Sequence, residues 1–492
     1  MRSILVRLIK WAAVLLVVAV AGLLGIRAWD SQRGPPLAPW HTYVPHDLKA
    51  AKLAKLEWRG YLDAENKLFD EVRVNVTGKL DPEARIAANR YFDGSPIYPA
   101  KFATDWNRSY VLEPDAAPVG AVVLLHGLTD SPYSLRHVAR RYREHGYVVI
   151  APRLPGHGTV PAGLSAVDWE DWTAATRLAV REARRRVGAP RPLHLVGFSN
   201  GGALAMQYAL DALDDKSLAR PDRLVLLSPM IGITAFARFA GVFGWPAIFP
   251  SFANAAWLSV VPEFNPFKYN SFPINGARQS SLLTRVLRRQ IRDLARDNRL
   301  AGLPPILTFQ SVVDFTVSTR AIVDVLYAPL PANGSELVLF DVNRGAKVSP
   351  LLRSTTERAL ERLLPDPPRR FRTTIISSAG SDTGDVLERV TEAGATAEQA
   401  RKLGIAYPRE LFSLSHVAIP FPVSDALYGM DPGPEEDFGV NLGTLAVRGE
   451  VGMLIVSLDS LVRASSNPFF PYMLGRIEEG MSGRRDVPQR PQ

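Results

Sequence analysis

From about residue 110 onward, short apolar runs alternate with longer amphipathic stretches. Short apolar runs bounded by Gly and Pro are typical of buried strands, whereas apolar positions three or four residues apart predict helices. We predict strands over residues 119–125, 147–151, 193–196, 223–227, 305–309 and 336–340. Helices are predicted over residues 134–145, 168–187 and 201–213. This alternation indicates an α/β domain, with a mostly parallel sheet covered by helices on both faces and with its chemistry beyond the carboxyl ends of the strands.

The first 27 residues have a different pattern. Residues 11–26 carry no charge, and Arg7 and Lys10 precede them. Counted over residues 4–26, the segment has 23 residues. As a helix it would be about 35 Å long, enough to cross a hydrocarbon core of roughly 30 Å. The positive flank favours a cytoplasmic N-terminus. We therefore expect a single-pass membrane anchor over residues 1–27, with the remaining chain on the non-cytoplasmic (periplasmic or extracellular) side. The alternative is a cleaved signal peptide.

Residues 28–104 are predicted to form a tether and a helical arm. Pro and Gly are frequent up to about residue 45, and leucines at helix-compatible intervals follow up to about residue 74. The arm would pack on the main domain or form a small domain of its own. Within the main domain, 105–492, we interpret residues 229–304 as a cap insertion, because aromatic side chains are dense there. We interpret residues 343–410 as a second insertion that includes a helix near 384–393.

The composition adds mainly exclusions. Hydrophobic residues make up 47% of the 492 residues and charged residues 22%, which excludes a mainly disordered chain. The absence of cysteine excludes disulfides, thiolate metal sites and cysteine nucleophiles. The formal charge is +9, but acidic residues lie among the basic ones and no groove-reading motif accompanies them. We therefore expect no nucleic-acid partner, and nothing in the sequence implies a metal or an organic cofactor.

The turn after the predicted strand 193–196 reads Gly197-Phe198-Ser199-Asn200-Gly201. This is the pattern G-x-S-x-G between a strand and a helix. At such a turn the serine stands exposed, the glycines let the backbone approach closely, and the N–H groups of the helix lie near a developing oxyanion. The placement indicates that Ser199 is a nucleophile, although an ordinary glycine-rich turn has the same local pattern.

Several segments together resemble the α/β-hydrolase family, in the branch that contains monoacylglycerol lipases, carboxylesterases and serine aminopeptidase-like proteins. The segments are LLHGLTDSP (124–132), APRLPGHGT (151–159), LVGFSNGG (195–202), SVVDFTVS (311–318) and LSHV (414–417). They extend over about residues 105–425, and residues 1–100 contribute nothing to the resemblance. The resemblance implies an α/β-hydrolase fold and a serine nucleophile that works with an acid and a histidine.

In this fold the catalytic residues follow the order Ser, then Asp or Glu, then His. Of the eight histidines only His416 follows Ser199, so the resemblance implies His416 as the base. Asp314 follows the strand 305–309 and is the expected acid, which would fix the tautomer of His416. Asp341, after the next strand, is the main rival, and Asp382 and Asp385 are weaker candidates.

The same resemblance implies where the oxyanion would bind. The backbone N–H of Leu128, after His126 and Gly127, and the N–H of Asn200 would form the oxyanion hole. Since backbone groups do this work, the side chains at these positions are free to vary. His126 and His157 are expected to have structural roles.

Together these expectations describe a membrane-anchored serine hydrolase that cleaves carboxylic esters through an acyl-enzyme on Ser199. The cap segment is apolar, so an acyl ester or lipid, such as a monoacylglycerol or lysophospholipid, is the favoured substrate. Two alternatives stay open. The same residues would serve an amide, peptide or thioester hydrolase, or the chain would be a non-catalytic, membrane-tethered binding module.

Overall fold

The computed structural model describes residues 2–31, 34–232, 250–314, 316–347, 349–351, 360, 362–380, 384–443 and 463–481. The helices are α1 (Arg2–Ser31), α2 (Pro39–Thr42), α3 (Ala50–Leu53), α4 (Trp58–Asn75), α5 (Arg136–Glu144), α6 (Trp169–Val187), α7 (Asn200–Asp214), α9 (Ile274–Arg296), α10 (Thr319–Ala321) and α12 (Phe470–Glu478). The strands are β1 (Tyr110–Leu112), β2 (Gly120–Leu125), β3 (Tyr147–Ala151), β4 (Leu193–Phe198), β5 (Arg223–Leu227), β6 (Trp257–Ser259), β7 (Phe272–Pro273), β8 (Ile306–Ser311), β9 (Glu336–Phe340), β10 (Arg372–Ser378), β11 (Asp385–Thr391), β12 (Glu398–Ala406), β13 (Ser413–Leu414) and β14 (Arg463–Ala464).

Ten strands form one sheet in the order β1-β3-β2-β4-β5-β8-β9-β10-β11-β12. The seven strands from β3 to β10 run parallel, whereas β1 at one end and β11 and β12 at the other are antiparallel to their neighbours. In the register, Leu125 pairs with Gly197 and Phe198 pairs with Leu227. The turns that follow β2, β4 and β5 therefore lie side by side at one edge of the sheet.

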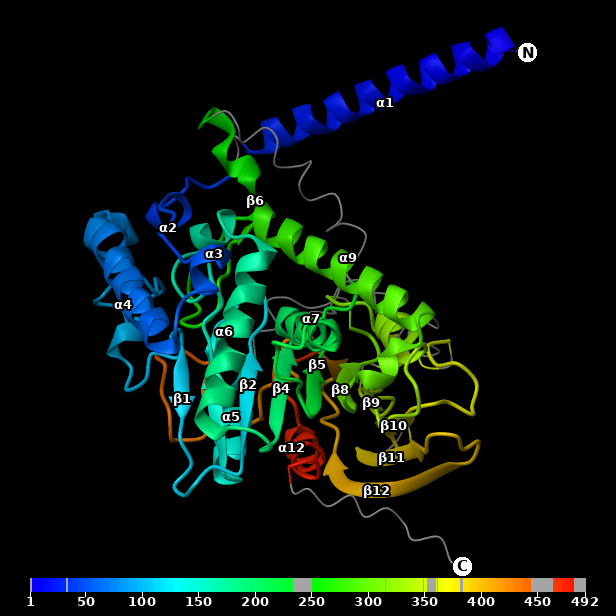
Figure 1. The fold of residues 1–492 in the computed structure, drawn as a ribbon. Coiled ribbons are helices and arrows are strands. Elements are labelled where there is room, and N and C mark those ends of the chain that lie inside the picture. The colour runs from blue at the N-terminus through cyan, green and yellow to red at the C-terminus, as the bar shows by residue number, and fades with distance from the viewer. Residues whose placement is uncertain are drawn as a thin grey trace, which may run out of the picture.

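Helices cover both faces of this sheet (Figure 1). One hydrophobic core joins α6, α7 and α9 to strand residues such as Val123 and Leu125. A second core joins α5 and α12 to the alternate strand residues, among them Val122 and Leu124. Burial on both faces explains why the central strands are continuous apolar runs in the sequence. The two cores hold the sheet, and so the turns at its edge, in a fixed position.

The N-terminal arm packs on the main domain. Leu53 and Tyr61 lie in the same core as α6 and α7. The buried guanidinium of Arg153, in the turn after β3, donates to both carboxylate oxygens of Asp47 at 2.8 and 2.9 Å. It also donates to Glu65 at 3.1 Å. The arm is thus joined to the loop after β3 by buried charges as well as by apolar packing.

The segment predicted as a second insertion supplies β10, β11 and β12 to the main sheet. The helix predicted near 384–393 is wrong, because residues Asp385–Thr391 form β11 between β10 and β12. Along this strand Val386, Glu388 and Val390 are buried. Tyr472 donates a hydrogen bond to Glu388 at 2.7 Å, and Arg401 pairs with the same carboxylate. A buried charged residue in the middle of the alternation concealed the strand period in the sequence.

The middle of the predicted cap, residues 233–249, lies outside the described residues. The described remainder contains β6 and β7, which pair antiparallel, and the long helix α9. α9 packs against α7 and α6 on one face of the sheet (Figure 1). The cap therefore stays a prediction for the segment before α9.

The predicted transmembrane anchor over residues 1–27 needs correction. The segment is helical, but in the part of the chain that the structure describes no helix combines the length and apolar character that a bilayer crossing requires. The uncharged stretch 11–26 is shorter than the roughly 20 apolar residues of a typical span, and Arg7 and Lys10 lie in the same helix. The single-pass placement with a non-cytoplasmic catalytic domain is therefore wrong, and the predicted membrane partner lacks support.

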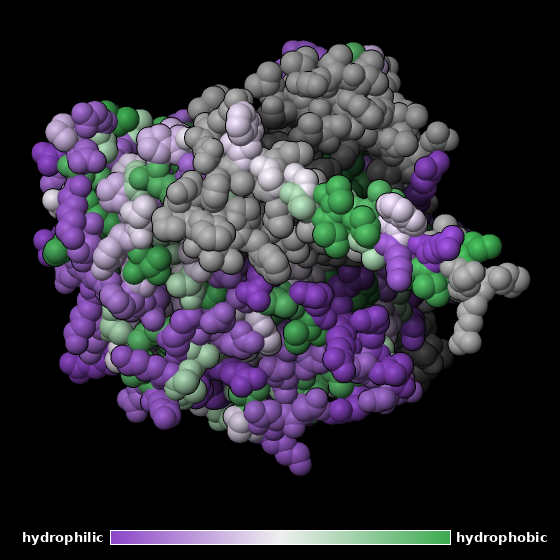
Figure 2. Space-filling model, turned by 90° about the horizontal axis from the view of Figure 1, so that it is seen from above, coloured by the Kyte–Doolittle hydropathy of each residue, from purple (hydrophilic) through white to green (hydrophobic). Residues whose placement is uncertain are grey.

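Basic residues on the surface are interspersed with acidic partners. Arg141 pairs with Glu144 at 2.8 Å, and Arg177 pairs with Asp211 at 2.7 Å. Seen from above, hydrophilic residues cover most of the described surface, and hydrophobic residues are gathered in small areas between them (Figure 2). The net charge of +9 is therefore spread over a surface of mixed sign.

Candidate active site

Ser199 lies in the sharp turn between β4 and α7. Its backbone has φ 53° and ψ −113°, a strained conformation for a residue with a side chain. The Ser199 N–H donates to the carbonyl oxygen of Leu227 at 2.9 Å, and its own carbonyl oxygen accepts from the N–H of Met230 at 2.9 Å. These bonds to the end of β5 hold the turn in place, and Ser199 is 5% exposed.

The glycines of the motif allow this turn to form. A methyl group on Gly201 would lie 1.9 Å from the carbonyl oxygen of Leu125, and one on Gly197 would lie 2.3 Å from the carbonyl oxygen of Gly201. Both distances are far below van der Waals contact. The pattern G-x-S-x-G is thus required by the close packing of β4, α7 and the end of β2.

The structure brings His416 and Asp314 together. His416 Nδ1 lies 2.7 Å from Asp314 Oδ2. Because an ionised carboxylate only accepts, Nδ1 carries the hydrogen and Nε2 is left as the basic nitrogen. The His416 ring also stacks on the ring of Phe198, with centroids 5.3 Å apart, and Phe198 directly precedes Ser199. All three predicted catalytic residues therefore lie at the same edge of the sheet.

The carboxylate of Asp314 accepts from every side. Its Oδ1 accepts from the N–H groups of Thr316 and Val317 at 2.9 and 3.0 Å, and its Oδ2 also accepts from Gln310 Nε2 at 3.0 Å. Burial by itself raises the pKa of Asp314, but His416 and the hydrogen bonds from Val317 and Gln310 lower the pKa by more than burial raises it. The pKa therefore lies below its ordinary value. Asp314 is thus ionised at neutral pH.

The rival acid Asp341 lies elsewhere. It is 1% exposed at the end of β9, where its partner is Arg344 at 3.3 Å. Burial raises the pKa of Asp341, and Arg344 offsets this only in part. Asp385 begins β11 and pairs with a lysine at 3.5 Å, and Asp382 lies outside the described residues. Of the candidate acids that the structure describes, Asp314 is the one hydrogen-bonded to His416.

The loop after β2 lies directly against Ser199. A methyl group on Gly127 would be 3.4 Å from Ser199 Cβ. Among the described residues, the N–H groups of Leu128 and Asn200 have no hydrogen-bond acceptor. An oxyanion next to Ser199 would provide one. The predicted oxyanion-hole residues therefore lie close to Ser199, one after the end of β2 and the other at the N-terminus of α7.

His126 holds this loop. Its Nδ1 donates to the carbonyl oxygen of Gly127 at 2.9 Å, and its Nε2 accepts from the N–H of Leu154 at 3.0 Å. Burial, together with the nearby His157, lowers the pKa of His126 well below its ordinary value, so the ring is neutral. Burial also lowers the pKa of His157 to about 4. Both rings are buried neutral groups that join the loops after β2 and β3.

A pocket of about 410 Å³ lies beside His416. Its lining includes Ser415 and Val417, which flank the histidine, and the apolar side chains of Val261, Phe264 and Leu442. Ser199, Asp314 and His416 are not among its lining residues, but the pocket borders the segment that carries His416, and it is large enough for a small acyl group or alcohol.

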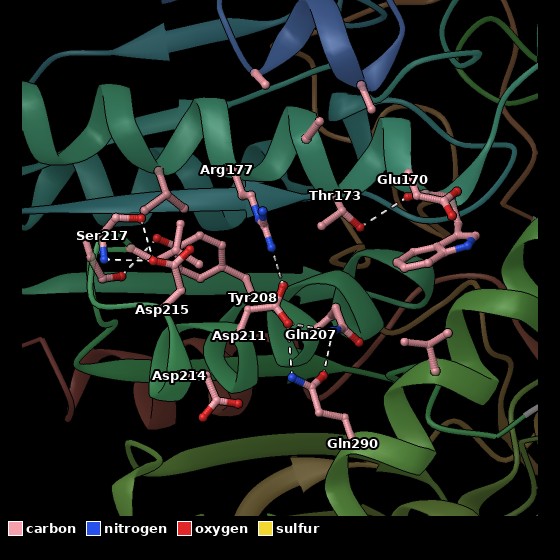
Figure 3. A pocket seen from close by; sticks show the side chains of 18 of the residues that line it. Glu170, Thr173, Arg177, Gln207, Tyr208, Asp211, Asp214, Asp215, Ser217 and Gln290 are labelled. Atoms are coloured by element: carbon pink, nitrogen blue, oxygen red, sulfur yellow. Dashed lines mark hydrogen bonds and ion pairs between the residues drawn. The ribbon is translucent and has the colours of Figure 1, made fainter.

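A larger cavity, of about 1270 Å³, lies between α6, α7 and α9 (Figure 3). Arg177 from α6 and Gln290 from α9 both point to Asp211 on α7, at 2.7 and 3.1 Å (Figure 3). These polar side chains of the lining are thus hydrogen-bonded to one another. Neither the predicted catalytic residues nor their neighbours in the chain line this cavity, so its size does not make it the active site.

Comparison with known proteins agrees with this arrangement. Residues 116–331 match the family described as "Serine aminopeptidase, S33", a match that includes Ser199 and Asp314 and ends before His416. A thermostable monoacylglycerol lipase from Bacillus sp. (strain H-257) is 36% identical over 92 residues, which cover 19% of this chain and 35% of the lipase. Within residues 116–331, this match agrees with the α/β-hydrolase arrangement of the sheet and the serine turn described above.

Other proteins that resemble this chain differ in the function that their names give. The magnesium-chelatase 30 kDa subunit of Rhodobacter capsulatus is 33% identical over 198 residues, 38% of this chain and 57% of that subunit. The crystal structure of a soluble variant of monoglyceride lipase from Saccharomyces cerevisiae, in complex with a substrate analog, has a TM-score of 0.38. It shares 13% sequence identity and covers 47% of this chain and 81% of that one. The chain thus spans between a third and three fifths of the length of the two sequence relatives.

Two residues of the site were not anticipated from the sequence. Gln310 bonds Asp314, and Phe198 stacks on His416. The signal for Gln310 was its place four positions before the predicted acid, at the end of a predicted strand. For Phe198 the sequence offered no signal beyond its place in the motif, because the partner ring is more than 200 residues away.

Proposed function

We propose that this α/β-hydrolase is a serine hydrolase that cleaves carboxylic esters through an acyl-enzyme on Ser199. The observation that carries the proposal is the hydrogen bond of 2.7 Å between His416 and Asp314, at the same edge of the sheet as the strained turn of Ser199. A base oriented by an ionised acid, beside a serine at such a turn, is the arrangement that activates a hydroxyl group.

Acylation and deacylation of Ser199 use the same groups. His416 Nε2 takes the proton of Ser199 Oγ as the oxygen attacks the ester carbonyl. The N–H groups of Leu128 and Asn200 hold the oxyanion, a contribution of about 2.7–4 kcal/mol per donor in other enzymes. His416 then gives the proton to the leaving alcohol. Water repeats the attack on the acyl-enzyme, with His416 again as the base. His416 returns the proton to the oxygen of Ser199 as the acid leaves, and Asp314 stays ionised throughout.

The favoured substrate has an apolar acyl group. The pocket beside His416 has apolar walls, and each methylene group buried there contributes about 0.8 kcal/mol of binding. The monoacylglycerol lipase among the relatives supports an ester of this kind. A monoacylglycerol or a lysophospholipid is the substrate class that we propose.

A second candidate is the hydrolysis of an amide or peptide bond. The family description "Serine aminopeptidase, S33" favours it, because the matched segment includes the proposed nucleophile. A panel of butyrate esters, butyryl thioesters and aminoacyl amides separates the two, with the higher kcat/KM deciding between them.

Labelling with a fluorophosphonate tests the serine chemistry. We expect the folded protein to be labelled once, and Ser199→Ala to abolish the label while the protein keeps its circular dichroism spectrum. Absence of labelling in the folded, unaltered protein would instead favour the non-catalytic binding module.

A further inference from the structure

The last two residues of β8 bond both members of the proposed acid–base pair. Gln310 and Ser311 are fully buried and, as neighbours on a strand, point to opposite faces of the sheet. Gln310 Nε2 donates to Asp314 Oδ2 at 3.0 Å. Ser311 Oγ donates at 3.1 Å to the carbonyl oxygen of Leu414, two residues before His416. The end of this strand thus holds the acid directly and the base through the segment that carries it.

The amide group of Gln310 has one possible orientation. Its Nε2 lies 3.0 Å from the carboxylate of Asp314 and 3.2 Å from the carbonyl oxygen of Ser311, and both groups only accept. It also lies 3.0 Å from Thr319 Oγ1, whose own hydrogen goes to the carbonyl oxygen of Ser311 at 3.0 Å. An amide oxygen in this place would face three acceptors. The NH₂ group therefore occupies it, and one donor is always directed at Asp314.

The other end of the amide adds nothing to the stability of the fold. Gln310 Oε1 is buried and has no hydrogen-bond partner in the part of the chain that the structure describes, which is an unfavourable arrangement. The acceptors around Nε2 also keep other bonds. Asp314 Oδ2 has His416, and the carbonyl oxygen of Ser311 has Thr319. Stability alone therefore gives no reason for a glutamine here, whereas its hydrogen bond to the acid does.

We propose that Gln310 is a positioning residue, which holds Asp314 Oδ2 toward His416 Nδ1 through both halves of the reaction. The proposal rests on the serine hydrolase function proposed above. Asp314 Oδ1 is held by N–H groups of its own turn, at Thr316 and Val317, whereas Gln310 ties Oδ2 to the sheet. The N–H dipole of the amide also favours the ionised carboxylate, so the proton stays on the imidazole during the attack.

The substitution Gln310→Met tests this role, because methionine has a similar length and no donor. Hydrolysis of 4-nitrophenyl butyrate gives kcat and KM, and urea unfolding gives the midpoint. We expect kcat to fall about tenfold, or ~1.4 kcal/mol in activation free energy, while KM and the urea midpoint stay nearly the same. The acid limb of the pH profile of kcat/KM should move to higher pH. Without the N–H dipole the pair of Asp314 and His416 takes up a proton more easily, and the limb belongs to the pair as a unit.

Gln207→Met is the matched control. Gln207 on α7 is also buried, its Nε2 donates to the carboxylate of Asp211 at 2.9 Å, and its Oε1 likewise has no partner among the described residues. It lines the larger cavity, away from the proposed catalytic residues (Figure 3). We expect the same substitution there to leave kcat and the acid limb as they are in the unaltered protein.

The outcomes separate this role from the hydrolase function itself. If the unaltered protein cleaves the ester but folded Gln310→Met keeps a near-normal kcat, or an acid limb that has not moved, the positioning role is wrong and the hydrolase function stands. An equal loss in Gln207→Met would also overturn it, because the effect would then belong to any buried glutamine. If the unaltered protein cleaves no ester and binds no fluorophosphonate, the hydrolase function fails and this role with it.

A second variant covers the case in which Gln310→Met does not fold. In Gln310→Asn the amide is shorter by one methylene group and cannot reach Asp314 Oδ2, so kcat should fall and the acid limb should move in the same way. A folded Gln310→Asn with normal kinetics would contradict the proposal. If neither variant folds, Gln310 holds the fold rather than the acid, and the proposal is wrong.

Discussion

The substitution Asp314→Asn removes one charge and one acceptor while it keeps the shape of the side chain. The carboxylate accepts four hydrogen bonds, from His416, from Gln310 and from the N–H groups of Thr316 and Val317. An amide has one oxygen, so in either orientation its NH₂ group faces two donors. With the NH₂ group toward His416, Nδ1 has to accept, and the hydrogen moves to Nε2.

A hydrogen on Nε2 leaves His416 unable to take the proton of Ser199. The wrong tautomer lowers kcat by about 10⁴-fold in a serine protease, and we expect a loss of that order. The donors that lose their acceptor in this variant should also reduce the free energy of unfolding by about 1–3 kcal/mol. Single-turnover kinetics with 4-nitrophenyl butyrate measure the first effect, and urea unfolding measures the second.

Asp341→Asn is the matched control, because its side chain is as buried as that of Asp314 and it follows the adjacent strand, but it pairs with Arg344. We expect the kcat of Asp341→Asn to stay within about tenfold of that of the unaltered protein, which corresponds to a change of roughly 1.4 kcal/mol in activation free energy. The loss of a catalytic group would lower kcat by much more. The reasoning fails if folded Asp314→Asn keeps a near-normal kcat, or if Asp341→Asn shows the larger loss.

Three further predictions concern stability. Asp47→Ala leaves the buried Arg153 without its bidentate partner and should reduce the free energy of unfolding by about 3–5 kcal/mol. The exposed Asp70→Ala should change it by less than about 1 kcal/mol, and equal urea midpoints for the two would contradict this. The pKa of His157 is about 4 in the folded state against an ordinary 6.5. Its contribution is therefore present above pH 6.5 and is lost on acidification, by about 2 kcal/mol between about pH 7.5 and about pH 5. His157→Gln should flatten the pH dependence of unfolding by that amount, and an unchanged slope would argue against it. Gly201→Ala places a methyl group 1.9 Å from a carbonyl oxygen of β2, so we expect loss of both folding and activity. A stable, active variant, measured by thermal unfolding and ester cleavage, would be incompatible with that packing.

The central strands could be predicted from the sequence because burial on both faces makes them continuous apolar runs. All six predicted strands are found, from β2 to β9. The strands at the edge of the sheet were harder to predict. In β11 buried and exposed residues alternate, and the buried Glu388 interrupts the apolar pattern, so the charged residues there favoured a helix in the sequence. The anchor failed for a reason of length, because sixteen uncharged residues fall short of a span.

The parts of the candidate site that depend on a local motif, or on the order of residues along the chain, could be predicted from the sequence. Ser199 lies in a five-residue pattern, and His416 is the one histidine that follows it. The choice between Asp314 and Asp341 was not decided by the sequence, because both follow adjacent parallel strands. Only the hydrogen bond to His416 distinguishes them.

Trapping the covalent intermediate tests the central chemistry most directly. Acid quenching during the turnover of 4-nitrophenyl butyrate, followed by peptide mass spectrometry, locates the transferred acyl group. The proposed mechanism predicts a butyryl group on the oxygen of Ser199, less than one per molecule in the steady state and slower to form in Asp314→Asn. Turnover without any acyl group on Ser199, or with the group on another residue, would contradict it.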